Sequence, residues 1–305
     1  PAARRCRGQL PRPAFPEHGT PMSSKPISRP PPPPPPPSSA ARQPPPQEWS
    51  VRACSIFGIP VFLHFSLPLF LGFLCLTHAR LGAIGIIFAV CYAAVLFLTV
   101  TVHEFGHCLA AQKVGCRAER VLLWPLGGLA TCVMPTNPRD RMIVAAAGPA
   151  THLPMTLCWL ILSATTGYPI RFWSPAVPLE ASSLYHWLCW VGLYINVLLF
   201  VFNLLVPVFP LDGSQLLLNF LLLRGATPAR AARIIILVSV PMAVLLAGWA
   251  LVNGNSLGCF LVLWLGMQTW RLHQAAAAGR LETHPLFVDV APRGGPGMSG
   301  QAQAV

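Results

Sequence analysis

The sequence predicts an all-α polytopic membrane protein with about six transmembrane helices and one short membrane-embedded strand or re-entrant segment. Composition is the first reason. Of 305 residues, 54% are hydrophobic and only 10% are charged, whereas soluble domains carry about 25% charged residues. The mean hydropathy of +0.57 agrees with this class. The second reason is that apolar runs of about 20 residues recur from Phe57 onward, which is the length that crosses a bilayer core.

The apolar runs place the expected helices along the chain. The expected spans cover 57–77, 82–112, 142–164, 187–207, 232–252 and 257–272. A further apolar stretch, 214–223, is too short to span and is expected to continue the fourth helix past a break. Residues 121–133 are too apolar for an ordinary loop, yet Pro125, Gly127 and Gly128 exclude a regular helix. We expect a re-entrant loop or a short strand pair there, lining a protein cavity.

The positive charges favour one side of the membrane. The formal net charge is +12, but the basic residues lie between the apolar runs and in the N-terminal tail, which argues against a nucleic-acid partner. With six spans, twelve Lys and Arg residues from Arg42 onward face one side, and only Arg80 and Arg171 face the other. Cytoplasmic loops carry the excess of Lys and Arg, so both termini are expected to face the cytosol or an equivalent compartment. The lipid bilayer is therefore one expected partner.

Composition also divides the chain into three parts. Residues 1–50 are rich in Pro, Ser, Arg and Ala and predict a disordered, Pro-rich tail. Their Arg-rich, acid-poor character equally fits an organelle transit peptide, which leaves a plastid or mitochondrial membrane open as the location. Residues 51–275 form the expected transmembrane domain, and 276–305 form a polar C-terminal tail.

Two acidic residues stand apart from the rest. The chain has nine Asp and Glu residues, and only Glu104 and Asp212 lie in or beside apolar spans. An ionisable group at membrane depth is costly unless it is paired or coordinated, so it is a functional candidate by default. These two carboxylates are therefore the first candidates for chemistry.

Glu104 lies within the sequence His103-Glu-Phe-Gly-His107. Residues four apart project from one face of a helix, one turn apart, and this spacing suits two zinc–nitrogen bonds of about 2.0–2.1 Å. Glu104 lies beside that face, where it can act as a general base toward a water at the metal. The alternative is a pair of helix histidines whose ring nitrogens are satisfied by neighbouring carbonyls.

A catalytic zinc needs a third protein ligand, and Asp212 is the remaining carboxylate at membrane depth. The second and fourth spans run in the same direction, and both motifs lie toward their basic-side ends. Pro207, Pro210 and Gly213 break the fourth helix and allow the carboxylate to turn toward the metal. Taken alone, Asp212 would be read as a helix cap or turn residue. Together the motifs predict one zinc ion per chain, held by His103, His107 and Asp212.

These motifs resemble the site-2 proteases, a family of intramembrane zinc metalloproteases. The resemblance covers about residues 55–275 and depends mainly on His103–His107 and on Phe202-Asn-Leu-Leu-Val-Pro-Val-Phe-Pro-Leu-Asp-Gly213. Weaker supports are Gly58–Ser66, Pro125–Leu129 and Ala147–Pro149.

The resemblance implies an activity and site roles. It implies a zinc metalloendopeptidase that hydrolyses peptide bonds within or near transmembrane segments of membrane-protein substrates. It assigns the zinc ligands to His103, His107 and Asp212 and water activation to Glu104. It further implies that Asn203 steadies the oxyanion and that Gly127 and Gly128 belong to a strand that grips an unwound substrate.

Some residues depart from the family pattern and leave alternatives open. The segment between Asn203 and Asp212 is one residue longer than in compact bacterial members. His152 stands where many members have Asn, so it is either a substitute polar partner or a packed residue, and we expect packing. The alternative function is a catalytically inactive homologue that acts as a membrane chaperone or binding protein. The intact Glu104 argues against it. A metal permease would need ionisable groups along a path through several spans, and the sequence shows one cluster.

Overall fold

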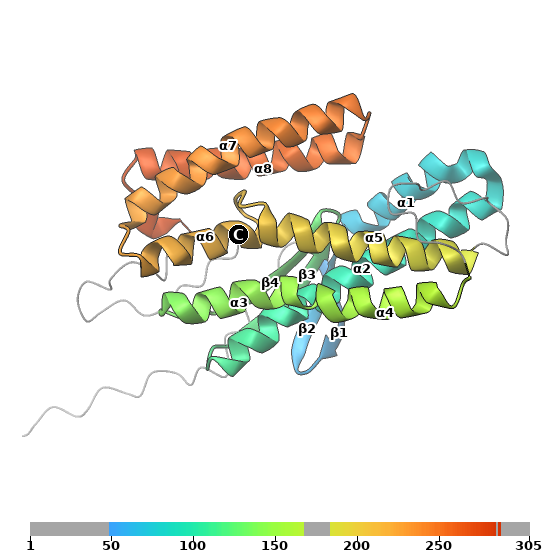
Figure 1. The fold of residues 1–305 in the computed structure, drawn as a ribbon, viewed down its shortest axis with the longest axis horizontal. Helices are drawn as coiled ribbons and strands as arrows, with labels where there is room; N and C mark the ends of the chain where they lie inside the picture. Colours follow the sequence, from blue (N-terminus) through green and yellow to red (C-terminus); the bar gives the residue numbers. More distant parts are fainter. Residues whose placement is uncertain (1–48, 168–183, 285, 288–305) are drawn as a thin grey trace, which may run out of the picture. The chain divides into compact units, whose positions relative to one another are not determined.

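The computed structural model describes residues 49–167, 184–284 and 286–287, all within one compact unit. Most of these residues are helical, and a small four-stranded sheet accompanies the helices (Figure 1). The helices are α1 (Ser66–His78), α2 (Gly82–Lys113), α3 (Pro138–Ala150), α4 (His152–Ala164), α5 (Leu184–Leu205), α6 (Asp212–Leu223), α7 (Pro228–Val252) and α8 (Ser256–Ala277), with 3-10 turns η2 (Ala79–Leu81) and η4 (Leu281–Thr283).

Four helical stretches among the described residues are long and apolar enough to cross a membrane by length and composition: Ser66–Lys113, Pro138–Ala164, Leu184–Leu205 and Pro228–Val252. The helical membrane class is therefore confirmed. The first stretch combines α1 and α2, and α8 is not among the four, so the expected number of six crossings stays a prediction.

The sheet corrects one expected span. Residues 57–64 do not begin a helix; they form the turn and second strand of a hairpin of β1 (Ser50–Ile56) and β2 (Ile59–His64). Ile59 and Val61 are buried while their neighbours are less so, which is the period-two pattern of a strand. A continuous apolar run does not by itself distinguish a strand from a buried helix, and this is why the expectation was wrong.

The segment 121–133 forms the strand pair that was one of the two expectations. Strands β3 (Ala118–Trp124) and β4 (Gly127–Cys132) pair antiparallel, while β2 and β3 pair parallel. The strand order is β1-β2-β3-β4, which leaves β4 at an edge of the sheet.

Helix α2 packs against the sheet and against several other helices. Ile59, Val61, Val121 and Leu123 of the sheet share one buried cluster with Val100, Phe105 and Cys108 of α2. Helix α2 also contacts α1, α3 and α5. A second cluster lies among α6, α7 and α8, and Figure 1 shows α7 and α8 side by side.

Prolines interrupt two of the expected helices. Pro149 lies near the end of α3, and the expected span 142–164 divides at Thr151 into α3 and α4. The fourth span ends at Leu205, and helix α6 begins at Asp212, as the sequence predicted for 214–223. The break around Pro207 and Pro210 therefore sets Asp212 in the first turn of a new helix.

Candidate metal centre

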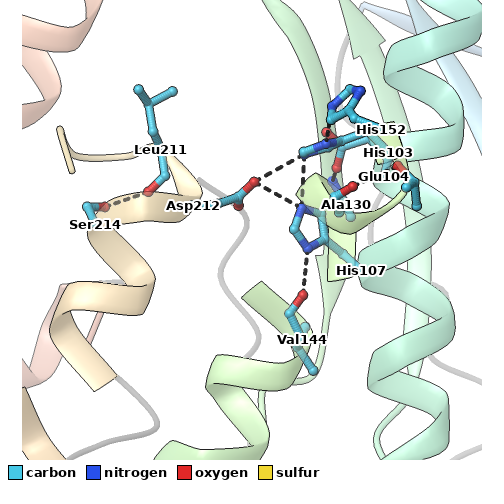
Figure 2. A network of polar contacts seen from close by, with 11 residues as sticks. His103, Glu104, His107, Ala130, Val144, His152, Leu211, Asp212 and Ser214 are labelled. Atoms are coloured by element: carbon cyan, nitrogen blue, oxygen red, sulfur yellow. Dashed lines mark hydrogen bonds and ion pairs between the residues drawn. The ribbon is translucent and has the colours of Figure 1, made fainter. Parts of the chain in front are cut away.

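The two histidines of the expected motif lie one turn apart near the C-terminal end of α2, as predicted (Figure 2). Their Nε2 atoms are 3.1 Å apart, and the two rings meet edge to face with centroids 4.8 Å apart. Both side chains are largely buried, with 8% and 11% of their surface exposed. The helix therefore presents two imidazole nitrogens at one point.

Asp212, in the first turn of α6, lies beside these two imidazole nitrogens. Its Oδ2 atom lies 3.1 Å from Nε2 of His103 and 3.4 Å from Nε2 of His107 (Figure 2). The three candidate ligand atoms lie within 4.8 Å of one another. The expectation that the two motifs meet is thus confirmed in the geometry.

This donor set fits a zinc ion. Two imidazole nitrogens and a carboxylate oxygen are the ligands of many catalytic zinc sites, which keep a fourth position open. Tetrahedral bonds of about 2.0–2.1 Å place neighbouring ligand atoms about 3.3 Å apart. The three distances of 3.1, 3.1 and 3.4 Å agree with that spacing.

The second nitrogen of each histidine has its own partner. Nδ1 of His107 lies 2.8 Å from the carbonyl oxygen of Val144 in α3. A carbonyl only accepts, so Nδ1 of His107 carries the proton and Nε2 keeps its lone pair for a metal. Nδ1 of His103 lies 3.0 Å from Nε2 of His152 in α4. His152 is fully buried, but it is a hydrogen-bonding partner and not merely a packed residue, which corrects the expectation from the sequence.

Glu104 lies between the histidines and the edge of the sheet. Its Oε2 atom accepts a hydrogen bond of 2.8 Å from the backbone N–H of Ala130 in β4 (Figure 2). A Cβ atom at Gly128 would lie 2.6 Å from Oε1 of Glu104 and would also collide with its Cγ and Cδ atoms. The absence of a side chain at Gly128 therefore makes room for the candidate base. The sequence did not reveal this contact.

Other glycines let the helices around the site approach closely. A Cβ atom at Gly148 of α3 would collide with the ring of His107. One at Gly106 of α2 would lie 2.6 Å from the carbonyl oxygen of Ala147. The segment 147–149, which entered only through the family resemblance, thus has a physical role in placing α3 against the metal group.

Not every expected site residue joins this group. Asn203 is half-buried in α5, two residues before the helix ends, and no hydrogen bond within the described ranges joins it to the metal group. The amide that does reach the site is Asn196, whose Oδ1 lies 3.1 Å from Nδ1 of His152. Gly127 opens β4 with a φ of 142°, a backbone conformation that favours glycine. The roles of Asn203 and Gly127 stay predictions.

Fold and site together define a class: a helical membrane protein whose buried centre offers two histidines and one aspartate to a metal. Comparison with known proteins agrees. Residues 91–171 match the model of peptidase family M50. The chain is 31% identical over 175 residues to a zinc metalloprotease of Methanocaldococcus jannaschii, covering 55% of this chain and 44% of that protein. It is also 31% identical over 231 residues to Rip3 of Mycobacterium tuberculosis, a candidate zinc metalloprotease, covering 72% and 52%.

A solved structure supports the same relationship. The site-2 protease from Methanocaldococcus jannaschii is 26% identical, with a TM-score of 0.52, and the match covers 73% of this chain and 94% of that one. The chain spans about half the length of the curated relatives it matches. The chain belongs to the M50, or site-2 protease, family of zinc metalloproteases.

Proposed function

We propose that this chain is an intramembrane zinc metalloendopeptidase that hydrolyses peptide bonds within or near the transmembrane segments of other membrane proteins. The observation that carries the proposal is the convergence of His103, His107 and Asp212. Their ligand atoms meet beside the carboxylate of Glu104 (Figure 2). The two histidines and Glu104 lie on a helical stretch that is long and apolar enough to span a membrane. A carboxylate beside two histidines on one helix is the arrangement of a metalloprotease.

The three side chains would hold one Zn²⁺ through Nε2 of each histidine and Oδ2 of the aspartate. When bound, zinc activates water and polarises a carbonyl. Glu104 would take the proton of the attacking water at Oε1, because Oε2 is held by the N–H of Ala130. Its burial excludes bulk water, and the same backbone contact fixes the orientation of its carboxylate.

The outer edge of β4, which no other strand of the described residues pairs with, is the proposed binding place for substrate. An extended segment that adds to an exposed sheet edge gains main-chain hydrogen bonds. Gly127 and Gly128 present backbone without side chains there, and Glu104 lies against the same edge. A helical substrate would have to unwind locally before its carbonyl could be attacked. Asn203 is proposed to steady the oxyanion.

The finer membrane arrangement is part of the proposal. Residues 51–275 would form the transmembrane domain with six crossings and both termini on the basic side. Cysteines introduced at Arg117 and at Thr166 should differ in labelling by an impermeant reagent in intact vesicles. Equal labelling of both would contradict six crossings.

Reconstituted protein tests the activity. A single-span reporter with a mid-span Gly-Pro pair should be cut faster than a poly-Leu version, because Gly and Pro cost about 1 and 3 kcal/mol in a helix interior and so ease unwinding. Mass spectrometry should locate the cut within or next to the span, and Glu104→Gln should abolish it. Binding of both reporters without cleavage would instead favour the inactive chaperone-like homologue.

A further inference from the structure

A chain of buried hydrogen bonds extends from the metal group into two other helices. Nδ1 of His103 lies 3.0 Å from Nε2 of His152, and Nδ1 of His152 lies 3.1 Å from Oδ1 of Asn196. Nδ2 of Asn196 donates to the carbonyl oxygen of Gly192 at 2.8 Å, within α5. His152 and Asn196 are both 0% exposed. Figure 2 shows His152 against His103, on the side away from Asp212.

The last bond in this chain determines the direction of all the others. The carbonyl of Gly192 can only accept, so the amide nitrogen of Asn196 must face it, and Oδ1 of Asn196 must face His152. That oxygen also only accepts, so Nδ1 of His152 carries a proton. In a neutral imidazole the other nitrogen is then an acceptor, and Nε2 of His152 receives the Nδ1–H of His103.

We propose that His152 and Asn196 are positioning residues that fix the tautomer and the ring orientation of His103. They keep the proton of His103 on Nδ1, so the lone pair of Nε2 points toward Asp212. This inference depends on the proposed zinc centre and adds two residues to it. His107 obtains the same tautomer from a single backbone carbonyl, that of Val144, while His103 obtains it through two side chains.

The geometry excludes a direct ligand role for His152. Its Nε2 atom faces Nδ1 of His103 and its Nδ1 atom faces Asn196, so both ring nitrogens are engaged away from Oδ2 of Asp212. Outer partners of this kind orient a ligating histidine and raise its basicity, and their loss usually costs about 10–100-fold in metal affinity. If His152 only filled space, a side chain of similar shape without hydrogen bonds would replace it equally well.

Matched substitutions separate hydrogen bonding from packing. In His152→Gln, one amide oxygen can accept from His103 and one amide nitrogen can donate to Asn196. His152→Met has a similar shape and neither bond. Asn196→Leu keeps the branched shape and the number of side-chain heavy atoms but removes both hydrogen bonds of Asn196. Asn219→Leu is the control. Asn219 is equally buried and also donates to a carbonyl four residues earlier, that of Gln215, but it is not part of the hydrogen-bond series that ends at His103.

The measurement is the zinc dissociation constant of the metal-free protein, obtained by competition with a chelator in detergent, with thermal melting as the check on folding. His152→Met and Asn196→Leu should weaken zinc binding by about 10–100-fold. His152→Gln should recover most of the affinity, and Asn219→Leu should match the parent protein. The two weakening changes should also be non-additive when combined, because they interrupt one chain.

Three results would overturn the positioning role: unchanged zinc affinity in His152→Met, equal losses in the Gln and Met variants, or additive effects of His152→Met and Asn196→Leu. The first would leave the proposed function intact, because zinc would still bind and only the positioning role would fail. Absence of zinc binding by the parent protein would instead overturn the proposed function, so the two failures are distinguishable.

Discussion

The histidine side and the aspartate side of the metal centre are held in different ways. Each imidazole has a hydrogen-bond partner on a neighbouring helix, Val144 for His107 and His152 for His103. Oδ2 of Asp212 is buried, and the groups found beside it in the described part of the chain are the two imidazoles. Hydrogen bonds to neighbouring helices therefore orient the two histidine rings, whereas the aspartate is positioned by the backbone that precedes it.

That backbone depends on α7 and α8. The N–H of Phe209 donates to the hydroxyl of Ser239 in α7 at 3.1 Å. The Phe209 side chain is buried with Ile235 of α7 and Leu272 of α8. Asp212 follows directly in the first turn of α6, where a negative charge is favoured by about 0.3–1 kcal/mol. Substitutions on the two sides of the centre should consequently differ in their effects on zinc affinity, on proteolysis and on stability.

The largest effect should come from the ligands themselves. His103→Ala, His107→Ala and Asp212→Ala should each weaken zinc binding by more than about 100-fold. The loss of a residue that only supports a ligand costs about 100-fold at most. Glu104→Gln should retain the metal. Metal analysis of the purified variants tests this, and tight zinc binding by Asp212→Ala would show that the third ligand lies elsewhere.

The next effect concerns the base and leaves the metal in place. In Gly128→Ala the new methyl group would collide with Glu104 and displace its carboxylate. We expect proteolysis to fall by about 10²-fold or more, in line with the loss of a general base, at unchanged zinc content. Gly72→Ala is the control, since a Cβ atom there meets nothing within 4 Å. Normal activity in Gly128→Ala would argue against this position of Glu104.

A smaller effect should mark the aspartate side. Ser239→Ala removes the acceptor of a buried N–H, which costs about 1–3 kcal/mol of stability. Because the backbone before Asp212 loosens, zinc affinity should also fall, though less than in the ligand variants. Ser163→Ala, at a buried serine of α4, is the control. If zinc affinity is unchanged while the melting temperature drops, Phe209 does not position the aspartate.

The smallest effect should depend on pH. His284 follows η4, its ring lies 5.5 Å from that of Phe209, and its Nδ1 accepts from the N–H of Leu286. Burial lowers the pKa of His284 below its ordinary value of 6.5, so the packed segment favours the neutral ring. The stability of the packing of η4, Leu286 and Phe287 should be constant above pH 6.5 and should decrease as the pH falls below that value.

Hydrogen exchange of this C-terminal segment between about pH 5 and 8 measures that change. In His284→Gln the pH dependence should disappear. Equal pH dependence in both proteins would assign it to another group.

The sequence predicted the grouping of His103, His107 and Asp212 better than it predicted the surroundings of these residues. Glu104 and Asp212 emerged because charge at membrane depth is costly, and the spacing of His103 and His107 is fixed by the helix. Residues 57–64 were misread because their apolar run resembles the start of a span, whereas they form a turn and the strand β2.

The partners of the site were harder to see. The contact of Ala130 with Glu104 depends on how β4 lies on α2, which no local pattern encodes. Asn196 carried a weaker signal, since a buried amide in an apolar helix also needs a partner, but it bears no charge and costs less at membrane depth than a carboxylate.

The length of α2 bears on what becomes of a substrate. With 32 residues the helix measures about 48 Å, more than the hydrocarbon core of about 30 Å. His103 lies ten residues before Lys113, so the candidate metal centre is about 15 Å along the axis from the C-terminal end of α2. In the proposed reaction, any cut inside a substrate span of about 20 residues would leave at least one fragment with ten or fewer of them. That number is too small to cross the bilayer core as a helix, so that fragment would be free to leave the membrane.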